Sequence, residues 1–164
     1  MHVAALFTAW GDDEAKKFMQ GLRQNGVRVA SSNGEVKRLV ASSEVAFGVA
    51  DNDDASEALK EGAPVEVVYP DQDGMGTLLV PTSEVLIKGG PNPSNGKQMV
   101  DYLLSADVEK QMAESASHIP LRPDVTVPAG VPSAAGTRFM PVDYGKLAET
   151  MERIQPWLRE WAGL

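Results

Sequence analysis

The chain of 164 residues contains no cysteine, which excludes disulfide bonds, thiolate nucleophiles and cysteine-ligated metal centres. Its two histidines, His2 and His118, lie at the chain start and beside a proline, and this arrangement argues against a shared metal site. The sequence also lacks a Gly-x-Ser-x-Gly nucleophile motif and a Gly-x-x-x-x-Gly-Lys phosphate loop. Any catalysis by this chain would therefore depend on carboxylates.

Basic residues and long hydrophobic runs are also scarce. The 15 Lys and Arg residues are outnumbered by 23 Asp and Glu residues, and the net charge of -8 argues against a nucleic-acid partner. No run approaches the roughly 20 apolar residues of a membrane span. The opening segment, MHVAALFTAWGDDE, has no basic start and turns acidic at once, so we expect no signal peptide in this chain.

Predicted helices and strands alternate along the chain. Helical spacing and capping residues predict helices over 3–10, 12–25, 35–42, 54–61, 94–104, 106–116 and 143–161. Short apolar runs predict strands over 27–30, 44–50, 64–69 and 77–87. This alternation is typical of an α/β fold, in which a mostly parallel sheet is flanked by helices and joined by right-handed crossovers.

An acidic turn follows the most apolar predicted strand. It reads Asp51, Asn52, Asp53 and Asp54, and ligands of α/β proteins bind outside the carboxyl ends of strands. The three carboxylates can bind a hard cation or an amine-bearing solute, so Asp51, Asp53 and Asp54 are the candidate metal ligands. A purely structural alternative is a capping box between Asp54 and Glu57.

Two further polar stretches supply candidate ligand contacts. Ser32 and Asn33 lie at a predicted helix start, where free backbone N–H groups favour an anion, although both are also common N-caps. Asp71 and Gln72 lie in the glycine-containing loop 70–76, which we expect at the edge of the cleft. That loop lacks the distal glutamate of a calcium loop.

Three ordered stretches carry a family resemblance: GVRVASSNGEVKRLVASSEVAFGVADNDDA, VEVVYPDQDGMGTLLVPTSEVLIKGGPNP and GKQMVDYLLSADVEKQMAESASHIPL. Together they resemble the C-terminal lobe of periplasmic solute-binding proteins of bacterial ABC importers, in the ferric-iron and phosphonate branch. The resemblance implies one lobe of a type II periplasmic-binding-protein fold over 1–121. A proline-rich crossing and a C-terminal amphipathic helix would follow over 122–164.

The resemblance also implies a function. The chain would be a fragment that carries half of a ligand cleft and captures a small solute, such as ferric iron, another metal ion or a phosphonate. The full protein would deliver that solute to an ABC permease from the periplasm or the cell exterior, without catalysis and without a required cofactor. A metal ion, if bound, would be such a solute and not a cofactor.

Some implications of the resemblance stay open. The iron binders place adjacent tyrosines at the position of Asp53 and Asp54, which puts ferric binding through a tyrosine pair in doubt here. An incomplete sheet would leave an exposed edge, so a homodimer through that edge or through segment exchange is expected. The alternatives from other classes are a metal-dependent carboxylate enzyme and a cytosolic sensor domain of the same fold.

Overall fold

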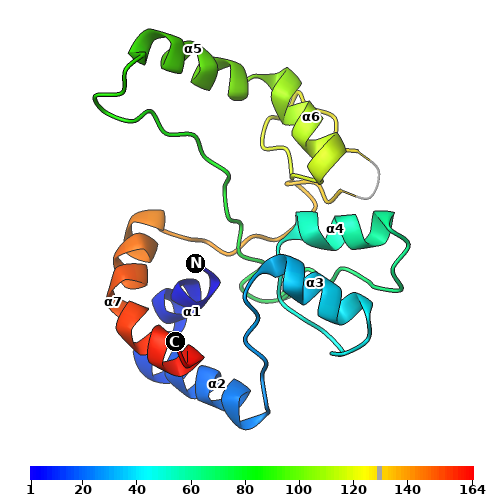
Figure 1. Ribbon diagram of the computed structural model, residues 1–164, viewed down its shortest axis with the longest axis vertical. Helices are drawn as coiled ribbons and strands as arrows, with labels where there is room; N and C mark the ends of the chain where they lie inside the picture. Colours follow the sequence, from blue (N-terminus) through cyan, green and yellow to red (C-terminus); the bar gives the residue numbers. More distant parts are fainter. Residues whose placement is uncertain (129–130) are drawn as a thin grey trace.

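The computed structural model describes residues 1–128 and 131–164, and in these residues the regular structure is helical (Figure 1). The helices are α1 (His2–Trp10), α2 (Asp12–Gln24), α3 (Asn33–Ala41), α4 (Asn52–Lys60), α5 (Pro93–Leu103), α6 (Ala106–Ala116) and α7 (Tyr144–Ala162). Every predicted helix is present, with ends that differ by a few residues at most.

The hydrophobic core lies between α1, α2 and α7, which join the two ends of the sequence (Figure 1). Its buried side chains are Ala4, Ala5, Phe7, Ala15, Met19, Leu147 and Ile154. Gly11 alone links α1 to α2, with φ of 81°, a left-handed value that glycine adopts without strain. Arg153 of α7 donates to Asp12 of α2 at 2.6 Å. The predicted division of the chain near residue 121 stays a prediction.

The remaining helices form a second group in which α4 packs against both α3 and α6. Lys37 of α3 donates to Glu57 of α4 at 2.5 Å, and Lys60 of α4 donates to the Ser115 carbonyl of α6 at 2.9 Å. Helix α5 contacts only α6 among the described helices, and Figure 1 shows it at the far end of a long extended segment. These helices therefore bury much less than the core of α1, α2 and α7.

The prediction of an α/β fold with a mostly parallel sheet is wrong for this structure. Across residues 1–128 and 131–164 there is no sheet, and the four predicted strands run as irregular chain. A strand needs a hydrogen-bonded neighbour, and among the described residues these segments form one isolated bridge, at Thr77. Their apolar side chains are consequently open to solvent, with Phe47 83% exposed and Ile87 77% exposed.

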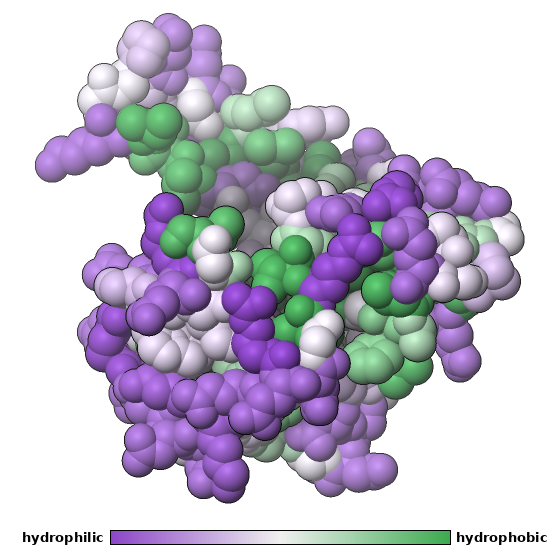
Figure 2. Space-filling view, turned by 60° about the horizontal axis from the view of Figure 1, so that its bottom comes forward, coloured by the Kyte–Doolittle hydropathy of each residue, from purple (hydrophilic) through white to green (hydrophobic). Residues whose placement is uncertain are grey.

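The apolar side chains of these segments add to the exposed hydrophobic surface of the molecule. Figure 2 shows hydrophobic surface across the middle of one face, between hydrophilic helices and the projecting part of the chain. The most exposed large apolar residues on the irregular segments are Phe47, Val49, Val68, Val85 and Ile87. Single exposed apolar residues are ordinary, whereas a continuous apolar area indicates an interaction surface.

One parallel bridge joins the middle of the chain to its later part. Thr77 donates its N–H to the Arg138 carbonyl at 2.9 Å, and Met140 donates to the Thr77 carbonyl at 3.0 Å. Gly76 precedes this bridge with φ of 92°, and a Cβ built there would lie 2.6 Å from the Arg138 carbonyl oxygen. Glycine is thus required at this close approach of two backbones.

Candidate functional site

The acidic turn forms the N-terminus of α4. Asp51 is the N-cap residue, but its side chain makes no capping hydrogen bond, while Asp53 and Asp54 lie in the first helical turn. The predicted capping box is therefore wrong, since Asp54 is inside the helix and the Glu57 carboxylate accepts from Lys37 instead. Capping does not occupy these carboxylates.

The N-terminus of α3 has, by contrast, a side-chain cap. Ser32 accepts a hydrogen bond from the Glu35 N–H at 3.1 Å, and Glu35 accepts from the N–H and the hydroxyl of Ser31 at 2.7 and 2.8 Å. This arrangement is a variant of the capping box, in which the Glu35 side chain reaches Ser31, the residue before the N-cap Ser32. The hydrogen bonds from Ser31 also lower the pKa of the Glu35 carboxyl. The Glu35 carboxylate thus bonds Ser31, beside the anion site predicted at Ser32 and Asn33, and that site stays a prediction.

The two helix N-termini converge. Asn33 donates its side-chain amide to the Asp51 carboxylate at 2.6 Å, which joins two predicted site residues that are 18 positions apart. The packing of α3 against α4, held by the Lys37–Glu57 ion pair, sets this approach. Carboxylate oxygens of Asp51, Asp53 and Asp54 lie within 4.8 Å of one another. The structure therefore brings together the side chains of four predicted residues, Asn33, Asp51, Asp53 and Asp54.

Electrostatics at this turn reflect the crowding of negative charge. Partial burial raises the pKa of the Asp54 carboxyl, the negative charge of Asp53 raises it further, and the Lys37 ammonium acts in the opposite direction. Mutual repulsion of like charges favours any cation that can be shared between them. The arrangement can hold an ammonium group or a hard metal ion through oxygen atoms.

Asn52 points away from the carboxylates. Its side-chain amide donates to the Ser117 carbonyl at 2.6 Å, and the hydroxyls of Ser56 and Ser117 are hydrogen-bonded to each other. These groups line a cavity of about 270 Å³ between α4 and residues 65–69, into which Tyr69 also faces. Sequence reasoning missed this cavity, because no local pattern relates Ser117 to α4.

Asp71 and Gln72 do not lie with the carboxylates of the α4 turn but in the loop before the parallel bridge. Asp71 accepts from the Met75 N–H at 2.6 Å and so closes its own loop. Gln72 donates to the Thr77 hydroxyl at 2.9 Å and accepts from the Arg138 N–H at 2.9 Å. The recorded bonds of both residues brace the loop and the parallel bridge, and none of them reaches the α4 turn among the described residues.

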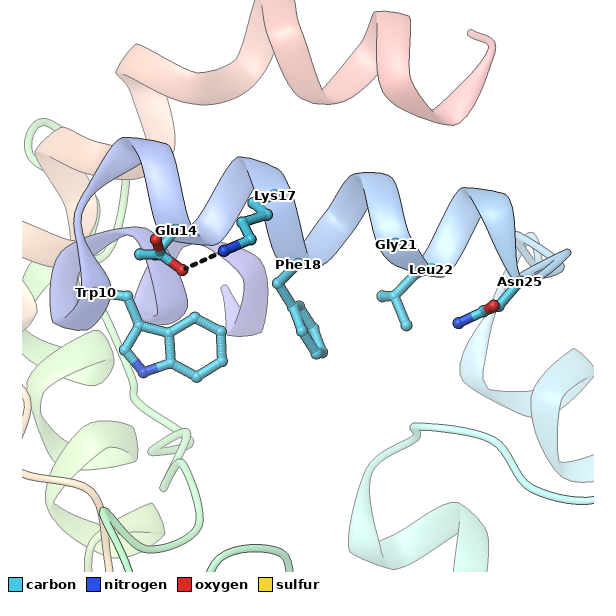
Figure 3. Close-up of a pocket in the computed structure, with 7 residues that line it drawn as sticks. All are labelled: Trp10, Glu14, Lys17, Phe18, Gly21, Leu22 and Asn25. Atoms are coloured by element: carbon cyan, nitrogen blue, oxygen red, sulfur yellow. Dashed lines mark ion pairs between the residues drawn. The ribbon is translucent and has the colours of Figure 1, made fainter.

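An open groove on α2 was also missed. It has a volume of about 600 Å³ and is lined by residues of α1 and α2: Trp10, Glu14, Lys17, Phe18, Gly21, Leu22 and Asn25. Figure 3 shows Phe18 and Leu22 projecting from the side of α2 that faces away from α7. The rings of Trp10 and Phe18 meet edge-on with centroids 5.4 Å apart. The apolar residues Phe18 and Leu22, four positions apart on the predicted helix 12–25, were the available signal.

Known proteins resemble most of this chain. A family described as bacterial extracellular solute-binding protein matches residues 4–138. A periplasmic protein of Salmonella typhi, named for binding 2-aminoethylphosphonate, is 24% identical over 160 residues, which is 94% of this chain and 43% of that protein. An uncharacterized protein of Haemophilus influenzae is 27% identical over 164 residues, covering 96% of this chain and 46% of that protein.

The chain therefore spans less than half the length of the curated relatives it matches. No solved structure matches it. Among the described residues, no helix is both long and apolar enough to cross a membrane.

Proposed function

This chain belongs to the bacterial extracellular solute-binding proteins, and we propose that it supplies one half of a solute-binding cleft centred on the N-termini of α3 and α4. The observation that carries the proposal is the bond between Asn33 and Asp51, because it joins two predicted binding stretches into one site. The carboxylates of this turn make no capping hydrogen bond to the N-terminus of α4, so they remain available to a ligand.

The ligand that we propose is a small organic solute with an ammonium group. Three carboxylates within 4.8 Å of one another favour a positive charge and repel an anion. A relative named for binding 2-aminoethylphosphonate supports a solute that carries an amino group at one end. The Asp51, Asp53 and Asp54 cluster would bind this amino end, and Asn33 would orient the Asp51 carboxylate.

Ferric iron receives less support as the ligand. The positions that the resemblance assigns to a tyrosine pair are Asp53 and Asp54, and the relative is named for a phosphonate. A divalent metal ion is the second candidate, because the same carboxylate geometry suits oxygen coordination. A carboxylate enzyme and a sensor domain have no observation of their own in their favour.

The family, described as bacterial extracellular solute-binding protein, supports a wider role in solute uptake. We place the complete protein in the periplasm or on the cell exterior, where it captures the solute and delivers it to an ABC permease without changing it. Half of a cleft buries a small ligand incompletely, so the chain by itself should bind at a dissociation constant of about 1 mM, corresponding to about -4 kcal/mol.

Nuclear magnetic resonance of the isotopically labelled chain suits such weak binding. Adding 2-aminoethylphosphonate should shift the backbone amide signals of residues 51–54, and ethylphosphonate, which lacks the amino group, should leave them unchanged. Asp53→Asn should weaken the response several-fold. Asp107→Asn is the matched control, because Asp107 occupies the same position in the first turn of α6.

Equal responses to both phosphonates would refute the assignment of the amino end. A response to manganese or calcium ions at these residues, with none to the aminophosphonate, would favour the metal instead. Tight, micromolar binding by a monomer would contradict the half-cleft.

A further inference from the structure

We propose that Gly34 of α3 determines which solutes reach the carboxylates of the α4 turn, because its missing side chain keeps one side of Asp54 open. This inference deepens the proposed function and rests on it. A solute whose ammonium group is carried on a carbon chain needs the space beside Asp54, and a longer side chain at position 34 would fill that space.

Gly34 faces Asp54 across the contact between α3 and α4, two helices that Figure 1 shows side by side. A Cβ built at Gly34 would lie 3.8 Å from Oδ1 of Asp54 and 3.9 Å from the Ser32 hydroxyl oxygen. Both are ordinary van der Waals distances. Any side chain at position 34 would therefore begin directly beside the Asp54 carboxylate.

One turn further along both helices, side chains fill the corresponding contact. Lys37 lies three residues after Gly34 and donates to Glu57 at 2.5 Å. Glu57 in turn lies three residues after Asp54, and residues three apart lie on the same side of a helix. Helix α3 therefore presents an ammonium group to Glu57 and no side chain to Asp54.

Neither backbone conformation nor packing requires glycine at position 34. Gly34 lies exposed in the first turn of α3, and its φ is outside the left-handed region that favours glycine. Among the described residues beyond its chain neighbours and the backbone of α3, no atom lies closer than 3.8 Å to a Cβ built there. Glycine weakens a helix relative to alanine, because it loses more conformational freedom on folding. The chain thus has a residue that disfavours α3 where α3 faces Asp54.

The open space favours one class of solute. Oδ1 of Asp54 borders it, and the carboxylates of Asp51 and Asp53 add negative charge within 4.8 Å. An ammonium group is attracted to this charge. Gly34 adds neither charge nor bulk, so the methylene group next to the ammonium can lie against its Cα. The preferred solute is therefore an unbranched primary amine.

Titration with 2-aminoethylphosphonate, followed through the amide signals of residues 51–54, tests the inference. Gly34→Leu should raise the dissociation constant at least about tenfold, because the leucine side chain fills the space beside Asp54. Gly34→Ala adds a single methyl group and should raise it about twofold or more. Gly21→Ala in α2 is the matched control and should leave binding unchanged, since a Cβ there would meet nothing within 4 Å.

Urea unfolding separates loss of binding from damage to the fold. Gly34→Ala and Gly21→Ala should both raise the urea midpoint, because each replaces a helical glycine at a position where a Cβ fits. A Gly34→Ala chain that is stabilised and binds more weakly supports the inference even where leucine disturbs the turn.

A stabilised Gly34→Ala chain with unchanged binding would overturn the inference, as would a Gly34→Leu chain that binds like the wild type. Both results would leave the proposed function in place. A destabilised Gly34→Ala chain would also overturn it, because the fold would then require glycine. A wild-type chain without any response at residues 51–54 would instead refute the proposed function, and this inference with it.

Discussion

Replacing Asp54 by asparagine should stabilise the chain. Partial burial and the neighbouring charges of Asp53 and Asp51 raise the pKa of this carboxyl, so the charged form is less favourable in the folded chain than in the unfolded chain. Asparagine keeps the shape of the side chain and removes its charge. The change therefore removes a repulsion that the folded state bears at neutral pH.

The size of the effect follows from the spacing of the carboxylates. Two unit charges at 4.8 Å repel by about 0.9 kcal/mol in water, so the two neighbours of Asp54 together contribute about 1.7 kcal/mol. Against this, an acidic side chain in the first turn of a helix gains about 0.3–1 kcal/mol from the helix dipole. After the attraction of Lys37 is also subtracted, we expect a net stabilisation of about 0.5 kcal/mol.

Urea unfolding at pH 7 and low salt measures this difference. Asp54→Asn should raise the free energy of unfolding, and 1 M salt should remove most of the gain because it screens the repulsion. Asp107→Asn should lower stability slightly, since Asp107 has a similar helix position without two acidic neighbours within the first turn. A destabilised Asp54→Asn chain, or a gain that salt does not reduce, would refute the electrostatic reasoning.

The contribution of Asp54 to stability changes with pH in the direction opposite to that of an ordinary ion-paired acid. Because the folded pKa of Asp54 is raised, its unfavourable contribution is present above the folded pKa and disappears as pH falls through that value. The advantage of Asp54→Asn should therefore shrink as the pH falls through the folded pKa of Asp54. The same substitution should weaken the response to an aminophosphonate, an exchange of function for stability that is common at binding sites.

Two further changes test the core and the cap. Leu147→Ala should lower the free energy of unfolding in urea by about 2–5 kcal/mol, because Leu147 is fully buried between α1, α2 and α7 and its removal leaves a cavity. A smaller loss would show that this core is not packed as described. Glu35 has a lowered pKa, so its stabilising effect is present above its unfolded pKa and is lost as pH falls through the folded value. Glu35→Gln should flatten that part of the acid unfolding curve, and an unchanged curve would contradict the capping box.

The helices were predictable because the signals that form them are local. Ser105 caps α6 through the Val108 N–H, and Ser32 caps α3, both as their sequence context predicts. The prediction of strands was wrong because an apolar run indicates only that a segment can join a sheet. Forming the sheet also needs a neighbouring strand from elsewhere in the chain. Phe47 and Ile87 fit a buried strand by pattern, yet they are 83% and 77% exposed in the described part of the chain.

The site was predictable to a similar degree. The crowding of Asp51, Asp53 and Asp54 is visible in four consecutive residues, and their proximity in space follows directly. The bond from Asn33 to Asp51 and the bond from Asn52 to the Ser117 carbonyl both depend on how the helices pack against one another. The spacing of these residues in the sequence therefore predicts neither bond. Gln72 looked like a cleft residue by its loop, yet its bonds tie Thr77 to Arg138.

The close backbone approach at Gly76 has a consequence for variation at this position. Any side chain there would need a left-handed backbone and would meet the carbonyl of Arg138 at once, so selection should tolerate almost no replacement. In a library of all single substitutions, screened for protease resistance, position 76 should be depleted of every residue except glycine. Gly21, whose Cβ would meet nothing within 4 Å, should accept alanine in the same library.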